Sequence, residues 1–254
     1  MLNDITPLIL TFNEVPNLRR TLEKLSWAKE VLVLDSFSTD ETLDIARSFP
    51  TVRIVQRPFD TFAGQCNFGL QQITTPWVLS LDADYVLTDG FRDELAALKP
   101  DNATAGFKAA FTYCVFGREL RASLYPPRTV LYRRERACYE DEGHGHRVRI
   151  EGGVAALRSR IFHDDRKPLD RWLGEQNRYM IREAAELLAT PMGELNFQDR
   201  LRRRIVIAPW LVFFYTLLAK GLILDGWPGW FYVLQRTYAE LLLSLRLLEH
   251  KLNR

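Results

Sequence analysis

The chain has 254 residues, 47% of them hydrophobic, and its 34 basic and 32 acidic side chains give a formal net charge of +2. This length suits one domain or one domain with an appendage, and the apolar fraction is high enough for a full core, which excludes a disordered chain. A charge this close to neutral gives no support for nucleic-acid binding, so we expect no nucleic-acid partner.

The cysteines and the N-terminus both indicate an intracellular setting. Cys66, Cys114 and Cys138 are odd in number and have no Cys-x-x-Cys spacing, which argues against a disulfide framework or a thiolate zinc site. Residues 1–5 have neither a basic nor an apolar leader pattern. We therefore expect no signal peptide and a catalytic part that stays in the cytoplasm.

The first hundred residues alternate between short apolar runs and helix-like stretches, which is the pattern of βαβ units with a parallel sheet. The run 31–34 is apolar throughout, as expected for a parallel sheet covered on both faces. A helix is expected after residue 17 from its amphipathic spacing, and a second one behind a cap at Ser38 or Thr39. The predicted strands are 5–11, 31–34, 52–55 and 77–81, and the predicted helices are about 18–25, 38–49 and 64–73.

Three of these strands end in polar clusters, at residues 11–14, 35–38 and 82–84. Open α/β sheets bind ligands at the carboxyl ends of their strands, so we expect the clusters to converge on one site. The chain has no Gly-x-Gly-x-x-Gly and no Gly-x-x-x-x-Gly-Lys-Ser/Thr motif, which disfavours a dinucleotide site and a phosphate-loop hydrolase.

Two carboxylates, Asp82 and Asp84, leave the fourth predicted strand on the same side because they are two residues apart. Carboxylates suit hard divalent cations that also take phosphate oxygens, which indicates a metal-bound nucleotide diphosphate as the ligand. A solvated acidic turn is the alternative. Asp35 also has two interpretations: a loop or helix-capping residue, or a residue that reads a base and a ribose.

Four spaced motifs together resemble the family 2 inverting glycosyltransferases, which are nucleotide-sugar enzymes. The motifs are Thr11-Phe12-Asn13-Glu14, Asp35-Ser36-Phe37-Ser38-Thr39-Asp40, Gly64-Gln65-Cys66-Asn67-Phe68-Gly69 and Asp82-Ala83-Asp84. The resemblance implies the GT-A fold of that family, a Rossmann-like, mostly parallel α/β sheet flanked by helices. It also implies a divalent cation, Mn²⁺ or Mg²⁺, as cofactor.

The resemblance further implies roles for single residues. Glu14 and Asp35 would hold the uracil and the ribose, Asp82 the ribose, and Asp84 the metal. The other nucleotide-binding residues implied in this way are Thr11, Asn13, Gln65 and Asn67. The last two would lie beside the diphosphate, although the arginine usual in the family is replaced here by Gln65 or Cys66.

The likeness extends to the family branch that elongates lipopolysaccharide cores and other surface glycans, and it covers nearly the whole chain. That branch carries a His-Glu pair where this chain has Gly145-His146, and an aspartate base of the wider family matches Asp141. An inverting transfer needs one base to take the proton of the acceptor hydroxyl. Asp141 is therefore the predicted base and His146 the second choice, with a solvated acidic loop as the alternative.

His163 matches the position of a histidine in the same branch, so the resemblance implies a further metal ligand beside Asp84. A structural histidine after an apolar run is the alternative. Between Arg118 and Arg136, six arginines and two glutamates are interleaved with aromatic residues such as Tyr125. Arginine suits phosphate, so acceptor recognition is expected there, with a solvated basic loop as the alternative.

The tail differs from the rest, because residues 205–219 carry no charge. As a helix this run reaches about 22 Å, short of the roughly 30 Å core of a bilayer, so a clean transmembrane span is not expected. Basic residues before the run and aromatic residues around it are typical of helices lying in an anionic bilayer face. These flanking residues are Arg200, Arg202, Arg203, Arg204, Trp210, Trp227, Trp230 and Tyr232. A buried core helix or a dimer interface is the alternative. A second helix is expected over residues 231–252, packed on the first helix or paired with another subunit.

Together these patterns predict a GT-A domain over residues 1–165, a connecting helix over 166–199 and a membrane-associating helical region over 200–254. The predicted function is metal-dependent transfer of a sugar from a nucleotide diphosphate donor, UDP by resemblance, to a lipid-linked or lipopolysaccharide-core acceptor at the cytoplasmic face of the bacterial inner membrane. Two alternatives are a polyprenyl-phosphate sugar transferase and a non-catalytic sugar-nucleotide-binding or membrane scaffold protein.

Overall fold

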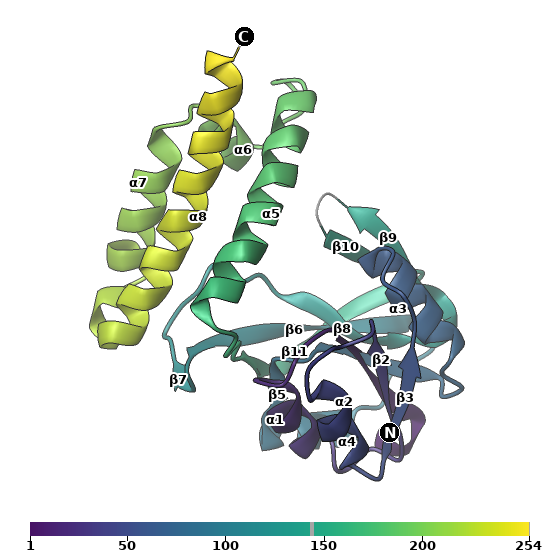
Figure 1. The fold of residues 1–254 in the computed structure, drawn as a ribbon. Helices are drawn as coiled ribbons and strands as arrows, with labels where there is room; N and C mark the ends of the chain where they lie inside the picture. Colours follow the sequence, from purple (N-terminus) through teal and green to yellow (C-terminus); the bar gives the residue numbers. More distant parts are fainter. Residues whose placement is uncertain (143–144, 254) are drawn as a thin grey trace. The chain divides into compact units, whose positions relative to one another are not determined.

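Two units share the chain between them, and the chain passes from one to the other three times (Figure 1). Residues 1–114 and 125–166 form the first, called here the sheet unit, and residues 115–124 and 167–254 form the second, the helical unit. The computed structural model describes residues 1–142 and 145–253, apart from the side chains of residues 142, 145 and 146.

The sheet unit is built on one mixed, mostly parallel sheet. Its strands are β1 (Ile5–Thr11), β2 (Val31–Asp35), β3 (Val52–Gln56), β4 (Trp77–Asp82), β5 (Tyr85–Leu87), β6 (Thr104–Val115), β8 (Arg128–Arg133) and β11 (Gly153–His163). They lie in the order β3-β2-β1-β4-β8-β6-β11-β5. The first four in this order are parallel, as is the β6–β11 pair, whereas β8 and β5 run antiparallel to their neighbours. The four predicted strands correspond to β1 to β4, so the predicted βαβ pattern is confirmed.

Four helices and a hairpin complete the sheet unit. They are α1 (Leu18–Glu23), α2 (Thr42–Arg47), α3 (Phe62–Gln71), α4 (Asp89–Ala97) and the antiparallel strands β9 (Ala137–Glu142) and β10 (Gly145–Ile150). One prediction is wrong in detail: neither Ser38 nor Thr39 caps α2, which begins only at Thr42. The reason is that both hydroxyls are engaged elsewhere: the Ser38 hydroxyl donates to Asp35 and accepts the N–H of Asn13, and the Thr39 hydroxyl donates to Asn13 Oδ1.

Alternation along the strands divides the core of the sheet unit into two layers, since successive side chains of a strand point to opposite faces. Ile9 and Val33 lie in the layer packed by α1, α2 and α4. Leu8 and Leu32, their neighbours along the chain, lie in the layer packed by α3 and the hairpin. Both faces of the sheet are therefore covered, which explains why the run 31–34 has no polar alternation.

The longer helices of the helical unit run side by side (Figure 1). Its elements are β7 (Arg118–Glu119), α5 (Leu169–Ala189), α6 (Phe197–Arg202), α7 (Ile207–Phe214), a π-helical turn (Tyr215–Ala219), a 3-10 turn (Leu222–Asp225) and α8 (Gly226–Leu252). Arg202 ties three of them together through ion pairs with Glu240 at 2.7 Å, Glu183 at 3.1 Å and Asp199 at 3.3 Å. The segment 115–124 belongs to this unit because Leu124 donates its N–H to the Tyr232 hydroxyl at 2.7 Å.

The apolar tail run is bent. In the described part of the chain, no single helix is long and apolar enough to cross a bilayer. Residues Ile207–Ala219 and Leu222–Leu252 meet that test of length and composition only together, as a pair bent by 66°. The chain turns between them at Gly221, whose φ of +71° lies in the left-handed region that glycine tolerates best.

We expect Gly229→Ala to destabilise the helical unit. A Cβ at position 229 would stand 2.0 Å from the backbone oxygen of Leu222, so α8 or the 3-10 turn would have to move. Overpacking of this kind costs about 1–3 kcal/mol, which urea denaturation of the full chain would measure. Gly174→Ala on the exposed face of α5 is the matched control, because its Cβ meets nothing within 4 Å and should leave stability equal or higher. Equal stability of both variants would contradict the tight contact at Gly229.

Candidate functional site at the strand ends

The polar ends of β1, β2 and β4 meet at one edge of the sheet, as predicted. Thr11 pairs with Asp35 in the β1–β2 ladder, and Leu10 pairs with Asp82 in the β1–β4 ladder. The strand order reverses between β1 and β4, because β2 and β3 extend the sheet on one side of β1 and β4 lies on the other. Ligands of open α/β sheets bind outside such a switch point. The candidate site therefore lies at the carboxyl ends of β1 and β4.

Asp35 is fully buried and holds the loop that follows β2. Its carboxylate accepts hydrogen bonds from Thr11 Oγ1 at 3.0 Å, from the N–H of Ser38 at 2.9 Å and from Gln56 Nε2 at 3.1 Å. The Ser38 hydroxyl adds a fourth bond. These bonds give Asp35 and Thr11 a structural role in shaping the site, and nucleotide contact by either side chain stays a prediction.

Asn13 and Glu14 join the loop after β1 to the loop after β2. Asn13 has a φ of +57° and accepts the N–H of Thr39 at 2.8 Å. The N–H of Glu14 donates to Thr42 Oγ1 at 2.7 Å, and its buried carboxylate accepts from Asn17 Nδ2 at 3.0 Å. The two loops are thus held as one rigid rim, and the predicted uracil contact of Glu14 is not tested by these bonds.

Sequence patterns did not single out the two aromatic residues in these loops. Phe12 and Phe37 are each half exposed; Phe12 directly follows the buried Thr11, and Phe37 lies two residues after the buried Asp35. Large apolar rings exposed at a ligand edge offer a flat surface for a nucleobase. The sequence did contain a signal for them. In both motifs a phenylalanine lies between two polar residues, outside any apolar run that would predict a buried side chain.

Asp84 and His163 lie together, as the resemblance implied. Asp82 ends β4 in an exposed position, whereas Asp84 is buried and its Oδ2 lies 3.3 Å from His163 Nε2. The histidine ends β11, where it pairs with Tyr85 of β5. Three chain segments therefore bring one carboxylate and one imidazole to the same point beside β4.

This pair fits a divalent cation. Two adjacent ligands on an octahedral cation with bonds of about 2.1 Å stand about 3 Å apart, close to the 3.3 Å between Asp84 Oδ2 and His163 Nε2. The other ring nitrogen of His163 is buried and has no hydrogen-bond partner among the described residues. Those residues contain no cluster of three or more acidic, histidine or cysteine ligands, so a cation here would take its remaining ligands from a bound diphosphate and water. An imidazole ligand favours Mn²⁺ over Mg²⁺, which prefers oxygen.

An ion-pair network anchors the residues that follow His163. Asp164 pairs with Arg20 of α1 at 2.6 Å and with Arg166 at 2.8 Å, and Asn17 donates to Asp165 at 2.9 Å. Burial lowers the pKa of the Arg20 guanidinium, and the neighbouring Asp164 acts against that shift. The network fixes the end of β11 against α1 and so positions His163. Its contacts with α1 could not be predicted, because Arg20 and Asn17 are 144 and 148 residues from their partners Asp164 and Asp165.

Three tyrosines surround His163. The ring centres of Tyr125, Tyr113 and Tyr85 lie 4.3, 4.8 and 5.4 Å from the imidazole, and the hydroxyls of Tyr85 and Tyr125 are hydrogen-bonded to each other. Burial, and next the charge of Asp82, raise the pKa of Tyr85 and of Tyr125, so both stay neutral hydroxyls at physiological pH. With these three rings, here called the tyrosine cage, beside it, the His163 side chain is 13% exposed, and that of Asp84 is 9% exposed.

The arginine run does not form one basic surface, and acceptor recognition by its members stays a prediction. Arg121 lies in the helical unit and pairs with Asp225 at 2.7 Å. Arg133 donates to the Thr104 carbonyl, Arg136 donates to the Asn102 carbonyl, and Arg134 pairs with Glu135. Only Arg128 stands at the site, 5.0 Å above the Tyr125 ring.

Gln65 and Asn67 have packing roles. Gln65 is buried and donates to the Pro58 carbonyl at 2.8 Å. Asn67 holds Tyr139 of β9 by two bonds, accepting its N–H at 2.8 Å and donating to its carbonyl at 2.9 Å. The predicted contact of both residues with a diphosphate stays a prediction.

Asp141 lies on the face of the hairpin that is turned toward β4. It shares that face with Tyr139, two residues earlier, whose hydroxyl donates to Ser80 Oγ at 3.1 Å, and Ser80 shares its face of β4 with Asp82. Asp141 Oδ1 also accepts the N–H of Ala63 at 3.4 Å, at the N-terminus of α3, where the helix dipole favours an anion. His146 pairs with Asp141 in the hairpin ladder, but its side chain lies outside the described residues.

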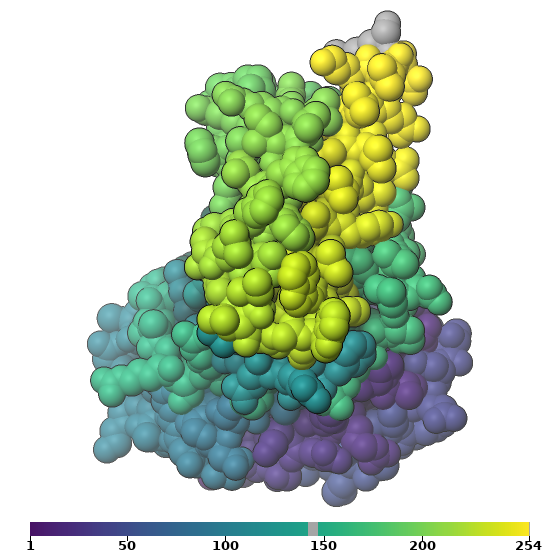
Figure 2. All heavy atoms as spheres, turned by 90° about the vertical axis from the view of Figure 1, so that its left-hand side faces the viewer, coloured from purple at the N-terminus to yellow at the C-terminus, as the bar shows by residue number. Residues whose placement is uncertain are grey.

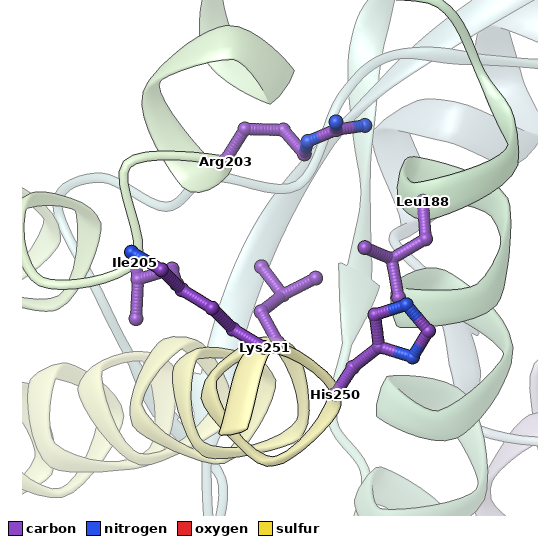
Figure 3. A pocket seen from close by; sticks show the side chains of 6 residues that line it. Leu188, Arg203, Ile205, His250 and Lys251 are labelled. Atoms are coloured by element: carbon purple, nitrogen blue, oxygen red, sulfur yellow. The ribbon is translucent and has the colours of Figure 1, made fainter. Parts of the chain in front are cut away.

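The helical unit contains a cavity of about 170 Å³ (Figure 3), lined by Leu188, Arg203, Ile205, Leu247, His250 and Lys251. Arg203 donates to the carbonyls of Leu187 and Thr190 and so caps the end of α5. With this cation engaged by the backbone, the cavity is a gap in helix packing and contributes nothing to the site at the strand ends.

The sheet order, the strand-end acids and the Asp84–His163 pair define an α/β protein of the GT-A type. The sequence pattern of Glycosyl transferase family 2 matches residues 8–163, more than half of the chain, so the chain belongs to that family.

Individual relatives cover less of the chain. It is 32% identical over 98 residues to the lipopolysaccharide core biosynthesis glycosyltransferase LpsC of Rhizobium meliloti, over 37% of this chain and 36% of LpsC. It is 35% identical over 92 residues to an uncharacterized glycosyltransferase of Rickettsia bellii, over 36% of this chain and 31% of that protein. The matches therefore span about a third of the length of these curated relatives.

A solved structure is similar over nearly the whole chain. The mannosyltransferase PcManGT of Pyrobaculum calidifontis, in complex with GDP-Man and Mn²⁺, aligns with 98% of this chain and 87% of its own at a TM-score of 0.53. Its sequence identity to this chain is 15%, so the likeness shows the fold alone.

Proposed function

We propose that the chain is a metal-dependent inverting glycosyltransferase that moves a sugar from a nucleotide diphosphate donor, UDP in the first instance, to a lipid-linked or lipopolysaccharide-core acceptor. The observation that carries the proposal is the Asp84–His163 pair, placed at the strand-end edge of a family 2 chain. The strand-end carboxylates and this pair both lie at the carboxyl ends of strands, where open α/β sheets bind ligands.

In this proposal the rim formed by the loops after β1 and β2 receives the nucleoside. Glu14 and Asp82 offer oxygen acceptors, and the exposed rings of Phe12 and Phe37 offer apolar faces to the base. Asp84 and His163 would hold Mn²⁺ or Mg²⁺, which would offset the charge of the departing diphosphate. The tyrosine cage keeps water from the pair, which limits hydrolysis of the donor.

Asp141 is proposed as the base that takes the proton of the acceptor hydroxyl, with His146 as the second choice. We expect Asp141→Asn to lower kcat by about 10²- to 10⁴-fold, because a positioned base contributes that much, while donor affinity stays unchanged. The measurement is transfer of labelled sugar to a bacterial lipid extract. Glu140→Gln is the matched control, since Glu140 precedes Asp141 and is paired with Arg149 at 2.8 Å.

Full activity in Asp141→Asn would remove Asp141 from the mechanism. If His146→Asn were fully active as well, the acceptor would need no base, as expected for the anionic oxygen of a polyprenyl phosphate. The second proposed function, a polyprenyl-phosphate sugar transferase, would then lead.

The outer face of α7 and α8 supports a lipid-linked acceptor. Between residues 206 and 219 every exposed side chain is apolar or aromatic, and so is every exposed side chain between residues 230 and 248. Figure 2 shows α7 and α8 in green to yellow. We call these exposed residues together the apolar face. Its large residues are Val206, Ile207, Trp210, Leu211, Phe214, Tyr215, Leu218, Leu234, Tyr238, Leu241, Leu245 and Leu248.

Charge adds to this support. Residues 200–254 contain nine basic and three acidic side chains, a net charge of +6. Since the whole chain has 34 basic and 32 acidic residues, residues 1–199 contain 25 and 29, a net charge of −4. An apolar face on the basic part of the chain suits an anionic bilayer. We therefore propose that the chain works at the cytoplasmic face of the inner membrane.

Calorimetric titration of the full chain with UDP and GDP, in the presence of Mn²⁺, Mg²⁺ or chelator, tests the proposed donor site. Metal-dependent binding of one nucleotide diphosphate is the expected result. Absence of binding to either would contradict the proposed function and leave a scaffold protein as the better interpretation.

A further inference from the structure

Arg128 is the one member of the arginine run that stands at the candidate site. It opens β8, and its guanidinium carbon lies 5.0 Å from the centre of the Tyr125 ring. The same ring lies 4.3 Å from the imidazole of His163. A single tyrosine therefore separates this cation from the proposed metal ligands.

The guanidinium has no ion pair or hydrogen bond to any residue that the structure describes, and its side chain is exposed. In this it differs from Arg121, Arg133 and Arg136, whose donors are taken up by a carboxylate or by carbonyls. Stacking on a ring fixes the plane of a guanidinium and leaves its N–H edges available. A guanidinium keeps its positive charge at physiological pH.

We propose that Arg128, stacked on Tyr125 beside Asp84 and His163, forms a phosphate subsite. A planar guanidinium with free edges pairs with phosphate through two parallel hydrogen bonds. The proposal rests on the proposed function, in which Asp84 and His163 hold a cation and the diphosphate. The phosphate group comes either from the donor diphosphate or from a phosphate carried by the acceptor.

With the donor as its source, the subsite acts on the leaving group. The acceptor oxygen forms a bond to the anomeric carbon, the bond from that carbon to the diphosphate oxygen breaks, and the electron pair stays on the diphosphate. The proton of the acceptor hydroxyl goes to the base, proposed as Asp141. Arg128 then stabilises the negative charge that grows on the phosphate oxygen, as preorganised donors do in other sites.

The test compares Arg128→Gln, Arg128→Lys and the matched control Arg19→Gln. Arg19 is also stacked on a ring, 6.0 Å from the centre of Phe49, but lies outside the candidate site. Binding of UDP and UMP with Mn²⁺ is measured by calorimetry on the full chain, after circular dichroism has established that each variant is folded. We expect Arg128→Gln to weaken UDP binding by about 10- to 100-fold and UMP binding far less, with a partial loss in Arg128→Lys and none in Arg19→Gln.

A second arm separates the two sources of phosphate. If UDP affinity is unchanged in Arg128→Gln, inorganic phosphate is titrated into UDP-saturated wild type and variant, and a loss confined to the variant assigns the subsite to the acceptor. Unchanged affinity for both probes overturns the proposal. If the wild type binds no nucleotide diphosphate, the proposed function fails and inorganic pyrophosphate decides: binding lost in Arg128→Gln retains the subsite, and equal or absent binding overturns it.

Discussion

Replacing Asp84 by asparagine is expected to abolish metal-dependent nucleotide binding. Asparagine keeps the size of the buried side chain but removes the negative charge that faces His163 at 3.3 Å. Because the described residues offer no third acidic or histidine ligand in one cluster, a cation depends strongly on this carboxylate. We expect the affinity for UDP in the presence of Mn²⁺ to fall by at least about 100-fold, to the value seen with chelator.

Calorimetry with UDP, and electron paramagnetic resonance of bound Mn²⁺, would measure this loss. Asp89→Asn is the matched control, since Asp89 is exposed at the start of α4 and its nearest cation, Lys24, is 3.6 Å away. His163→Gln should show a smaller loss in the same direction. An Asp84→Asn variant that binds UDP as tightly as the wild type, with and without chelator, would remove the metal from the proposed function.

A chain with four serines on the apolar face should no longer sediment with anionic vesicles. The substitutions are Trp210→Ser, Phe214→Ser, Leu241→Ser and Leu245→Ser, all at exposed positions, so the core of the helical unit is left intact. Burial of each such side chain in a bilayer is worth about 1 kcal/mol or more, so vesicle affinity should fall by at least about 100-fold. High salt should weaken wild-type binding as well, because the tail is basic.

The control for this test replaces three other exposed apolar residues of the helical unit, Leu169, Ile181 and Met192, by serine. It should sediment like the wild type. The exposed large residues of α8 from Leu234 to Leu252, which are leucines and Tyr238, also recur at alternating steps of four and three residues, a spacing that coiled-coil dimers use. If the wild-type chain does not sediment with vesicles but is dimeric by analytical ultracentrifugation, the apolar face is instead the contact with a second copy of the chain.

Local patterns were enough to predict the N-terminal half of the sheet. Apolar runs such as 31–34 are buried on both faces, so their composition alone predicts a strand. The start of α2 was predicted too early, because the hydroxyls of Ser38 and Thr39 bind Asp35 and Asn13 and do not cap the helix. The convergence of the strand ends followed from the rule for open sheets. The later strands β5, β6, β8 and β11 alternate in direction, and no local pattern specifies that order.

Residues of the site were predicted only where they belong to a recognisable sequence motif. The resemblance predicted that His163 and Asp84, nearly 80 residues apart, act together. The tyrosines around His163 and the Asp164 network have no local signature, since their partners come from distant segments of the chain. The members of the arginine run are dispersed for the opposite reason. Its members are neighbours in sequence, yet the chain crosses between the two units within the run and sends them to different places.

The two hydrogen bonds between the Asn67 side chain and the backbone of Tyr139 fix the position of the hairpin relative to α3. The side-chain amide of Asn67 presents one acceptor and one donor to the backbone of Tyr139. A neighbouring strand would offer the same pair of groups, so this one residue of α3 takes the place of a strand partner. Sliding β9 by one residue would break both bonds and bury the wrong face. Asp141 lies only two residues beyond Tyr139, so these two hydrogen bonds also fix the register that places Asp141 beside the N-terminus of α3.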